Sequence, residues 1–233
     1  MRAIQAGDSL TRQVYESVRH SIISGRLVPG SLHSVQSMAQ ELGVSRTPVR
    51  EALIDLAAQG MVRFERNRGV RILQTSVHDL EEIFALRVLL EVPATFRAAQ
   101  QFAAAGIASL KKEFAAQEKA VNADDEVRFM DHDRRFHGII LEASGNRRLA
   151  EFVDRLRDLV QTRGVSTAGR SRSLNTIMEE HRAILEAIER RDAASAATAM
   201  REHVLRTGEL LVSQHDAQDT SEARSWATVL RLD

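Results

Sequence analysis

The stretch Gly43–Leu53 (GVSRTPVREAL) decides the fold, because it predicts a tight turn followed at once by a short helix. Gly43 supplies the turn, since glycine adopts a positive φ without steric cost. Ser45 suits the N-cap position, and Pro48 is tolerated because the N–H groups of a first helical turn have no intrahelical partner. The apolar residues at helical spacing that we expect to face inward are Val49, Leu53 and Leu56.

The first turn of this helix carries side chains that favour DNA binding. Arg46, Thr47 and Arg50 cluster there, where the positive end of the helix dipole adds to the two arginine charges. Taken alone, the pattern also fits an ordinary capped helix with arginines on its surface. The neighbouring segments decide between these two interpretations.

The segments on both sides complete a winged helix. Upstream, residues 34–42 form a second short amphipathic run, so that two helices flank the turn, and a further helix is expected over residues 9–24. Downstream, residues 60–72 alternate about Asn67-Arg68-Gly69, which is typical of a β-hairpin. The basic side chains of this hairpin fit either a solvated face or DNA contact, and beside a helix-turn-helix we favour DNA contact: Arg63, Arg66, Arg68 and Arg71.

At these residues the chain resembles the GntR family of bacterial transcription regulators. The matching residues are Gly25–Gly30 (GRLVPG), Ala39–Leu53 (AQELGVSRTPVREAL), Gly60 and Gly69, and the resemblance covers the first seventy-odd residues continuously. It implies that the second helix of the motif docks in the major groove of an operator. The residues expected to contact DNA are Ser45, Arg46, Thr47, Arg50, Arg68 and Gly69.

The distribution of charge agrees with this interpretation, although the formal net charge of the 233 residues is zero. Residues 1–77 contain ten Lys or Arg and six Asp or Glu, whereas the remainder contain 22 and 26. The basic N-terminal part therefore concentrates the attraction for phosphate. The absence of cysteine and of any apolar run of about 18 residues predicts a cytoplasmic protein with no membrane partner.

After a polar connector at residues 74–77 the sequence turns helical and rich in Ala, Leu, Glu and Arg. We expect residues 1–73 to form the winged helix and residues 78–215 an all-α bundle, with residues 216–233 left unassigned. A mostly α protein with one small β-hairpin is the fold class that these patterns predict. The six expected helices cover about 77–101, 106–122, 124–144, 146–162, 172–190 and 192–215.

Four polar residues fall on the apolar faces of these helices. Asp133 and His137 lie one turn apart on a stripe of apolar residues, and His181 and His203 lie on the stripes of two later helices. Each of them alone fits a hydrogen-bonded core residue. Together, three imidazoles and a carboxylate form a metal-ligand set, because a buried carboxylate is costly without a counter-charge.

The donor set predicts one divalent transition metal, with zinc preferred over nickel, manganese or iron. An octahedral ion held by these four residues would leave two positions for water or a small molecule. Arg87 lies near the inward stripe of its own helix and could pair with a carboxylate ligand. An internal ion pair with Glu91, four residues later, explains Arg87 equally well, and a ligand could displace that pair.

The second half of the chain resembles the FCD-type effector domain of the FadR-like branch of the same family. The matching segments are Asp133–His137 (DRRFH), Glu180–Leu185 (EHRAIL), Met200–His203 (MREH) and Leu86–Glu91 (LRVLLE), within about residues 78–212. The resemblance implies a metal that binds small organic acids. Six helices instead of seven would place the chain nearer the shorter VanR-like branch.

These observations predict a homodimeric regulator that reads a palindromic operator and is controlled by a small organic acid. The acid can release DNA, as in a repressor, only by favouring a conformation that binds DNA less well. Two alternatives remain from other classes. One is a DNA-tethered metalloenzyme, against which stands the lack of a second acid placed as a general base. The other is a DNA-binding protein whose metal only stabilises the bundle.

Overall fold

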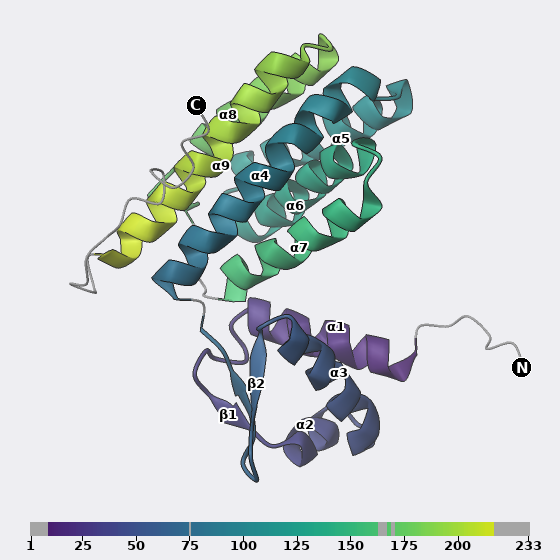
Figure 1. The fold of residues 1–233 in the computed structure, drawn as a ribbon, viewed down its shortest axis with the longest axis vertical. Coiled ribbons are helices and arrows are strands. Elements are labelled where there is room, and N and C mark those ends of the chain that lie inside the picture. Colours follow the sequence, from purple (N-terminus) through teal and green to yellow (C-terminus); the bar gives the residue numbers. More distant parts are fainter. Residues whose placement is uncertain (1–8, 75, 163–166, 169–170, 217–233) are drawn as a thin grey trace, which may run out of the picture. The chain divides into compact units, whose positions relative to one another are not determined.

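The computed structural model describes residues 9–74, 76–162, 167–168 and 171–216, and Figure 1 shows its elements. The chain divides into two compact units. The first falls within Met1–Thr75 and Asp158–Val165, and the second falls within Ser76–Arg157 and Ser166–Asp233. Part of the segment between residues 163 and 170 and the unassigned tail from residue 217 onward lie outside the described residues. The two units are treated separately below.

The first unit is a winged helix (Figure 1). Its strands pair antiparallel in the order β1-β3-β2 and form a small three-stranded sheet. The sequence predicted the hairpin of β2 and β3 but not β1, because two residues are too few to show alternation. In chain order its elements are α1 (Leu10–Ile23), β1 (Leu32–His33), α2 (Val35–Glu41), α3 (Arg46–Ala58), β2 (Val62–Glu65) and β3 (Gly69–Ile72).

The inward face of α3 forms the centre of this unit, as its apolar spacing predicts. Val49, Leu53 and Leu56 are fully buried and belong to one core cluster with residues of α1 and the sheet. Gly43 takes the positive φ of 67° that the turn requires. Ser45 occupies the N-cap of α3, but its side chain makes no capping hydrogen bond. The hydroxyls of Ser9 and Ser34, in contrast, cap α1 and α2.

Gly69 is required at the end of the wing by both its backbone angle and its surroundings. Its φ is 119°, a conformation that L side chains rarely adopt. A Cβ atom at this position would lie 2.1 Å from the carbonyl oxygen of His33 in the neighbouring strand. The close approach of β1 to β3 therefore depends on the absence of a side chain here.

The second unit is a bundle of helices, and within the described residues 76–216 it contains the six that the sequence predicts (Figure 1). Ser76 and Asp79 form a capping box that starts the first of them. The second begins at Ala104, so the expected start at Gly106 was two residues late. The six helices are α4 (Val77–Gln101), α5 (Ala104–Asn122), α6 (Glu126–Ala143), α7 (Arg147–Thr162), α8 (Leu174–Glu189) and α9 (Ala193–Asp216).

The bundle closes around a core that draws on every one of these helices. α4 packs along α9, α5 packs against α6 and α8, and Val153 of α7 packs with Leu141 and Ala94. The largest buried side chains are aromatic: Phe84, Phe102, Phe129 and Phe136. α4 continues through Pro93 without a break. No helix within the described ranges is both long and apolar enough to cross a membrane.

Candidate functional site

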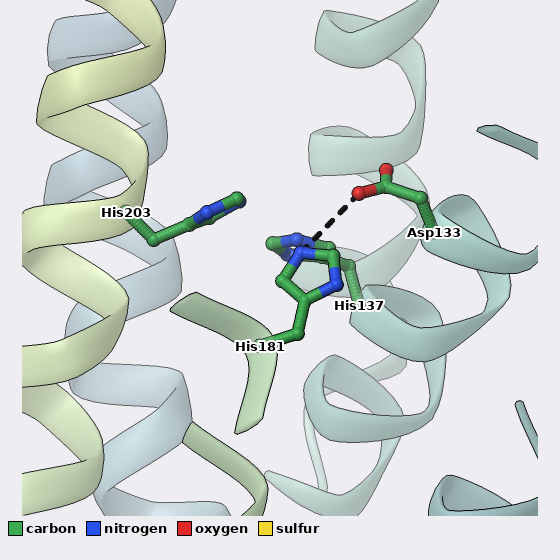
Figure 2. Close-up of side chains that lie close together, drawn as sticks. All are labelled: Asp133, His137, His181 and His203. Atoms are coloured by element: carbon green, nitrogen blue, oxygen red, sulfur yellow. Dashed lines mark ion pairs between the residues drawn. The ribbon is translucent and has the colours of Figure 1, made fainter. Parts of the chain in front are cut away.

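The structure brings Asp133, His137, His181 and His203 together inside the bundle. All four side chains are buried, and each contributes one donor atom to a group whose members lie within 4.8 Å of one another. Figure 2 shows the four side chains converging from α6, α8 and α9. The cluster predicted from helical spacing therefore exists as a spatial group that could hold a metal ion.

Helical geometry places these four residues. Asp133 and His137 are four residues apart on α6, so both project from the same face of that helix. The imidazole centroids of His181 and His203 lie 4.8 Å apart, and those of His137 and His203 lie 5.1 Å apart. Phe136 stacks on the His181 ring at 4.8 Å between centroids, which fixes the plane of that imidazole.

Each histidine of the cluster has an oxygen partner at its Nδ1 atom. When Nδ1–H donates to such an oxygen, the tautomer leaves a lone pair on Nε2, as in metal-binding histidines. The three acceptors come from different helices of the bundle. The pairs are His137 with Glu91 Oε2 at 2.9 Å, His181 with Gln117 Oε1 at 2.7 Å, and His203 with Glu180 Oε2 at 2.8 Å.

The Nε2 atoms of His137 and His181 are buried and have no hydrogen-bond partner. His181 Nε2 lies 3.3 Å from Asp133 Oδ1 without a hydrogen bond between them (Figure 2). A buried polar atom without a partner costs about 1–3 kcal/mol, so natural proteins rarely leave one. A cation at the centre would satisfy these lone pairs together, and the residues therefore fit a metal.

The other oxygen of Asp133 is held by Arg157 of α7 in a buried ion pair. Helical spacing alone does not reveal this ion pair, because the charged partner lies on another helix. Burial alone would raise the pKa of Asp133, but the charge of Arg157 outweighs it and holds this pKa well below its usual range. Asp133 is therefore an anion available to a cation.

The three histidines are neutral at neutral pH. Burial lowers the pKa of each of them, and the next cause is a nearby positive charge or a neighbouring imidazole. For His137 that second cause is Arg157, and for His181 it is His203. Neutral imidazole is the form that binds transition metals.

Arg87 of α4 is buried and forms the internal ion pair that the sequence allowed as one of two interpretations. Its Nε donates to Glu91 Oε1 at 2.6 Å, while Glu91 Oε2 accepts from His137. Burial raises the pKa of Glu91, but Arg87 and His137 outweigh it, so the carboxyl is ionised. Glu91 thus joins Arg87 to the histidine cluster.

Sequence reasoning missed the residues that orient the cluster from α5 and α8. Gln117 follows Leu110 and Phe114 at helical spacing, so the rule that found the histidines would have found this buried amide too. Glu180 gave no such signal, because it is one residue away from the helical position of His181. Its partner in the cluster, His203, lies on another helix, α9. Arg172 also pairs with Glu180 and donates to Thr167 and Thr207, both 3.0 Å away.

The residues expected to contact DNA lie at the start of α3 and on the wing. Ser45, Arg46, Thr47 and Arg50 are exposed there, while Pro48 and Val49 between them are buried. The Arg46 guanidinium lies 3.5 Å from Gln36 Oε1 of α2. The exposed side chains therefore form one polar surface over the apolar core of the winged helix.

The basic run of the hairpin separates into two groups. Arg71 pairs with Glu65 and donates to the carbonyl oxygen of Gly30, so it is held within the sheet. Arg68 is exposed and lies 3.3 Å from the same glutamate. Arg63 and Arg66 are also exposed. Arg71 is thus held by two interactions and is only partly exposed, whereas the other three arginines face solvent.

Comparisons with known proteins agree with the two halves of the structure. Residues 10–72 match the family of bacterial regulatory proteins called the gntR family, and residues 82–206 match the FCD domain. The chain is 26% identical over 83% of its length to the uncharacterized HTH-type transcriptional regulator YdhC of Bacillus subtilis, covering 85% of that protein. It is 30% identical over 84% of its length to a probable D-xylose utilization operon transcriptional repressor of Paenarthrobacter nicotinovorans, covering 86% of it.

The solved structure of Escherichia coli McbR/YncC shares the fold. It superposes with a TM-score of 0.80 at 24% identity, covering 90% of this chain and 100% of that one. The relatives are named as transcription regulators and not as enzymes. The protein belongs to the GntR family of bacterial transcription regulators, with a DNA-binding winged helix followed by an FCD effector domain.

Proposed function

We propose that this regulator binds a palindromic operator as a homodimer and is controlled by a small organic acid that binds at a metal centre. The centre would hold one divalent transition metal, with zinc preferred over nickel, manganese or iron, through Asp133, His137, His181 and His203. When bound, the metal supplies a Lewis-acidic position for a carboxylate. The observation that carries this proposal is the pair of unpartnered, buried Nε2 atoms of His137 and His181, the second of which lies 3.3 Å from Asp133 Oδ1.

The outer partners of the histidines support the same assignment. Each imidazole is fixed through Nδ1 by a carboxylate or amide oxygen, and such partners orient the ligands in metal sites. The donor chemistry of imidazole and carboxylate favours zinc and similar ions over calcium or magnesium.

Arg87 is the proposed partner of an acid carboxylate on the α4 side. Its guanidinium is engaged by Glu91 through Nε, and an arginine fork can bind a second carboxylate through its other N–H groups. An acid that replaced Glu91 on Arg87 would leave the bond from His137 to the other oxygen of Glu91 in place. The ion pair and the acid could therefore occupy Arg87 in turn.

The proposed DNA contacts follow from the exposed start of α3. Arg46 and Arg50 would pair with guanine edges or phosphates in the major groove, and Ser45 and Thr47 with phosphates. Arg68 and the backbone at Gly69 would bring the wing to the flanking groove. One winged helix makes too few contacts for specific binding at cellular salt, so two copies on a palindrome are required.

The site favours an acid over a neutral effector. The P. nicotinovorans relative is named for the utilization of D-xylose, a neutral sugar. In this chain Glu91 and Asp133 balance the charges of Arg87 and Arg157, so a divalent metal would leave an excess of positive charge. An anion neutralises that charge, whereas a sugar does not.

The test is operator binding by the full-length protein, measured by fluorescence anisotropy with a palindromic fragment selected from random DNA. Saturation with an effective acid is expected to change operator affinity by about 5–150-fold, the usual range of allosteric coupling. His181→Ala is expected to bind the operator but to ignore the acid. An acid response that persists unchanged in this variant would contradict the metal-dependent site.

The main alternative is a metal that stabilises the bundle without sensing an acid. It predicts that chelation lowers the unfolding temperature while no carboxylic acid alters operator affinity. Acid-dependent release of DNA that disappears on chelation distinguishes the regulatory centre from this structural one.

A further inference from the structure

A pocket of about 400 Å³ opens between α6 and α7 on the bundle. This volume falls in the range of small-molecule sites. Seven of its ten lining residues carry a charge.

Arg157 connects this pocket to the histidine cluster. Its side chain is 10% exposed and lines the pocket, while its guanidinium pairs with Asp133, which is itself a member of the cluster. One residue therefore separates the pocket from the proposed metal centre. A molecule that reached the inner end of the pocket would meet a guanidinium before it met the centre.

The other charges of the pocket cancel, because three arginines lie with three acidic residues. Arg134 pairs with Asp154, and Arg147 pairs with Glu151. Arg135 and Glu142 are exposed and, among the described residues, have no ion-pair partner. The pocket is thus lined by four arginines and three acidic residues, with one of those arginines already on Asp133.

Gly138 makes room for a ligand in the wall of the pocket. It lies in the middle of α6, where glycine costs about 1 kcal/mol relative to alanine. A Cβ atom added at this position would meet no atom within 4 Å. The space next to this glycine is therefore open.

Charge balance indicates what the pocket would admit once a metal is present. In the described structure the buried charges at the centre balance, since Arg87 and Arg157 face Glu91 and Asp133 and the histidines are neutral. A divalent cation adds two positive charges in a buried region. Uncompensated buried charge is costly, so one or two anionic groups must accompany the metal.

We propose that Arg157 receives one carboxylate of the effector, and that the pocket between α6 and α7 admits a short dicarboxylic acid whose second carboxylate lies near Arg135. This rests on the proposed function, because the metal attracts the first carboxylate. Arg157 holds Asp133 Oδ2 through one guanidinium nitrogen, so its other N–H groups can bind the incoming acid while the metal lies at Oδ1.

The experiment uses full-length protein loaded with Co²⁺, whose d–d absorption reports changes in its coordination. Wild type is titrated with acetate, succinate and octanoate. We expect succinate to bind more tightly than acetate or octanoate, because only succinate has a second carboxylate for Arg135. Arg157→Gln is expected to retain Co²⁺ and to weaken succinate binding at least about tenfold, because it loses a bidentate, charge-assisted contact.

Two further variants separate a ligand contact from a general structural effect. Gly138→Leu fills the pocket while leaving the ligand set untouched, so it should weaken succinate binding much more than acetate binding. Arg155 lies on α7, like Arg157, but it is exposed outside the pocket and packs over Phe152. Arg155→Gln should therefore behave as wild type. Thermal unfolding of each variant verifies that the bundle is intact.

The outcomes distinguish the two proposals. A wild-type protein that does not bind Co²⁺, or whose spectrum no acid changes, contradicts the proposed function and the inference with it. A wild type that responds to succinate while Arg157→Gln and Gly138→Leu respond equally well contradicts only the inference. If Arg157→Gln no longer binds Co²⁺, the Gly138→Leu titration decides, and an unchanged succinate affinity there overturns the inference.

Discussion

His181 Nε2 and Asp133 Oδ1 lie 3.3 Å apart in the buried centre of the bundle, with no hydrogen bond joining them. Two electron-rich atoms face each other there, because His181 is neutral and its Nδ1 is engaged by Gln117. This arrangement is unfavourable without a cation and favourable with one. The predictions about the metal centre follow from this pair.

Asp133→Asn is expected to weaken metal binding by more than about 100-fold. Loss of a group that only hydrogen-bonds a metal ligand already costs up to about 100-fold, and Asp133 is a proposed ligand itself. The substitution keeps the shape of the side chain but removes the only negative charge in the donor set. Competition with a chromophoric chelator measures the affinity. Asp131→Asn, on an exposed face of the same helix, is the matched control and should bind metal like wild type. Equal metal affinities for the two variants would show that Asp133 is not a metal ligand.

Gln117→Leu is expected to lower metal affinity about 10–100-fold without removing a ligand. The leucine leaves the His181 Nδ1–H without its acceptor, so the imidazole loses its orientation and its fixed tautomer. Gln117→Glu restores an acceptor oxygen and should recover most of the affinity. A leucine variant that binds metal as tightly as wild type would show that Gln117 serves only packing.

Removal of the metal is expected to destabilise the FCD domain. A ligand present at 100 times its dissociation constant stabilises the folded state by about 2.7 kcal/mol. Chelation should therefore lower the unfolding temperature of the wild type, as followed by circular dichroism. His181→Ala should show no such shift, since it has little metal to lose. A chelator effect of equal size in both proteins would point to another binding site.

Gly69→Ala is expected to destabilise the winged helix by about 2–5 kcal/mol, because it combines a left-handed backbone with a clash. The new Cβ would lie 2.1 Å from the His33 carbonyl oxygen. Gly25→Ala is the control, since its φ is also positive, at 74°, but its Cβ meets nothing within 4 Å. Gly25→Ala should lower the free energy of unfolding, measured with urea, by about 1–2 kcal/mol. Similar losses in both variants would contradict the role assigned to the close approach of β1 and β3.

Arg46→Ala and Arg50→Ala are each expected to cost about 1–3 kcal/mol of operator binding and to relax base preference at one position of each half-site. Arg66→Ala, on the wing, should instead weaken binding to all sequences alike and reduce the salt dependence by about one counterion. Anisotropy titrations at several salt concentrations separate the two effects. Uniform weakening by all three variants would assign Arg46 and Arg50 to phosphates alone.

Much of the fold could be predicted because local sequence signals agreed with one another. The turn at Gly43 and the inward positions Val49, Leu53 and Leu56 are encoded within a few residues, and the helices of the bundle follow from apolar spacing. β1 could not be predicted in this way. Its two residues become a strand only by pairing with β3, nearly forty residues later.

The candidate cluster was also accessible from the sequence, since a polar residue on an apolar helical stripe is a local signal. The ion pair of Arg157 with Asp133 was not accessible, because it depends on how α7 packs against α6. The same holds for Glu180, whose hydrogen bond to His203 joins α8 to α9. Pairs between helices are decided by tertiary packing and not by the periodicity of either helix.

The most direct test of the central claim is the metal content of gently purified protein, measured by elemental mass spectrometry beside His181→Ala and His132→Ala. His132 lies next to Asp133 but hydrogen-bonds Glu113 and is not a member of the cluster, so its variant controls for the loss of a histidine. We predict about one transition metal per chain in wild type and His132→Ala, and little or none in His181→Ala. No metal in any of the three, even after reconstitution, would contradict the metal centre and return the histidines to core packing.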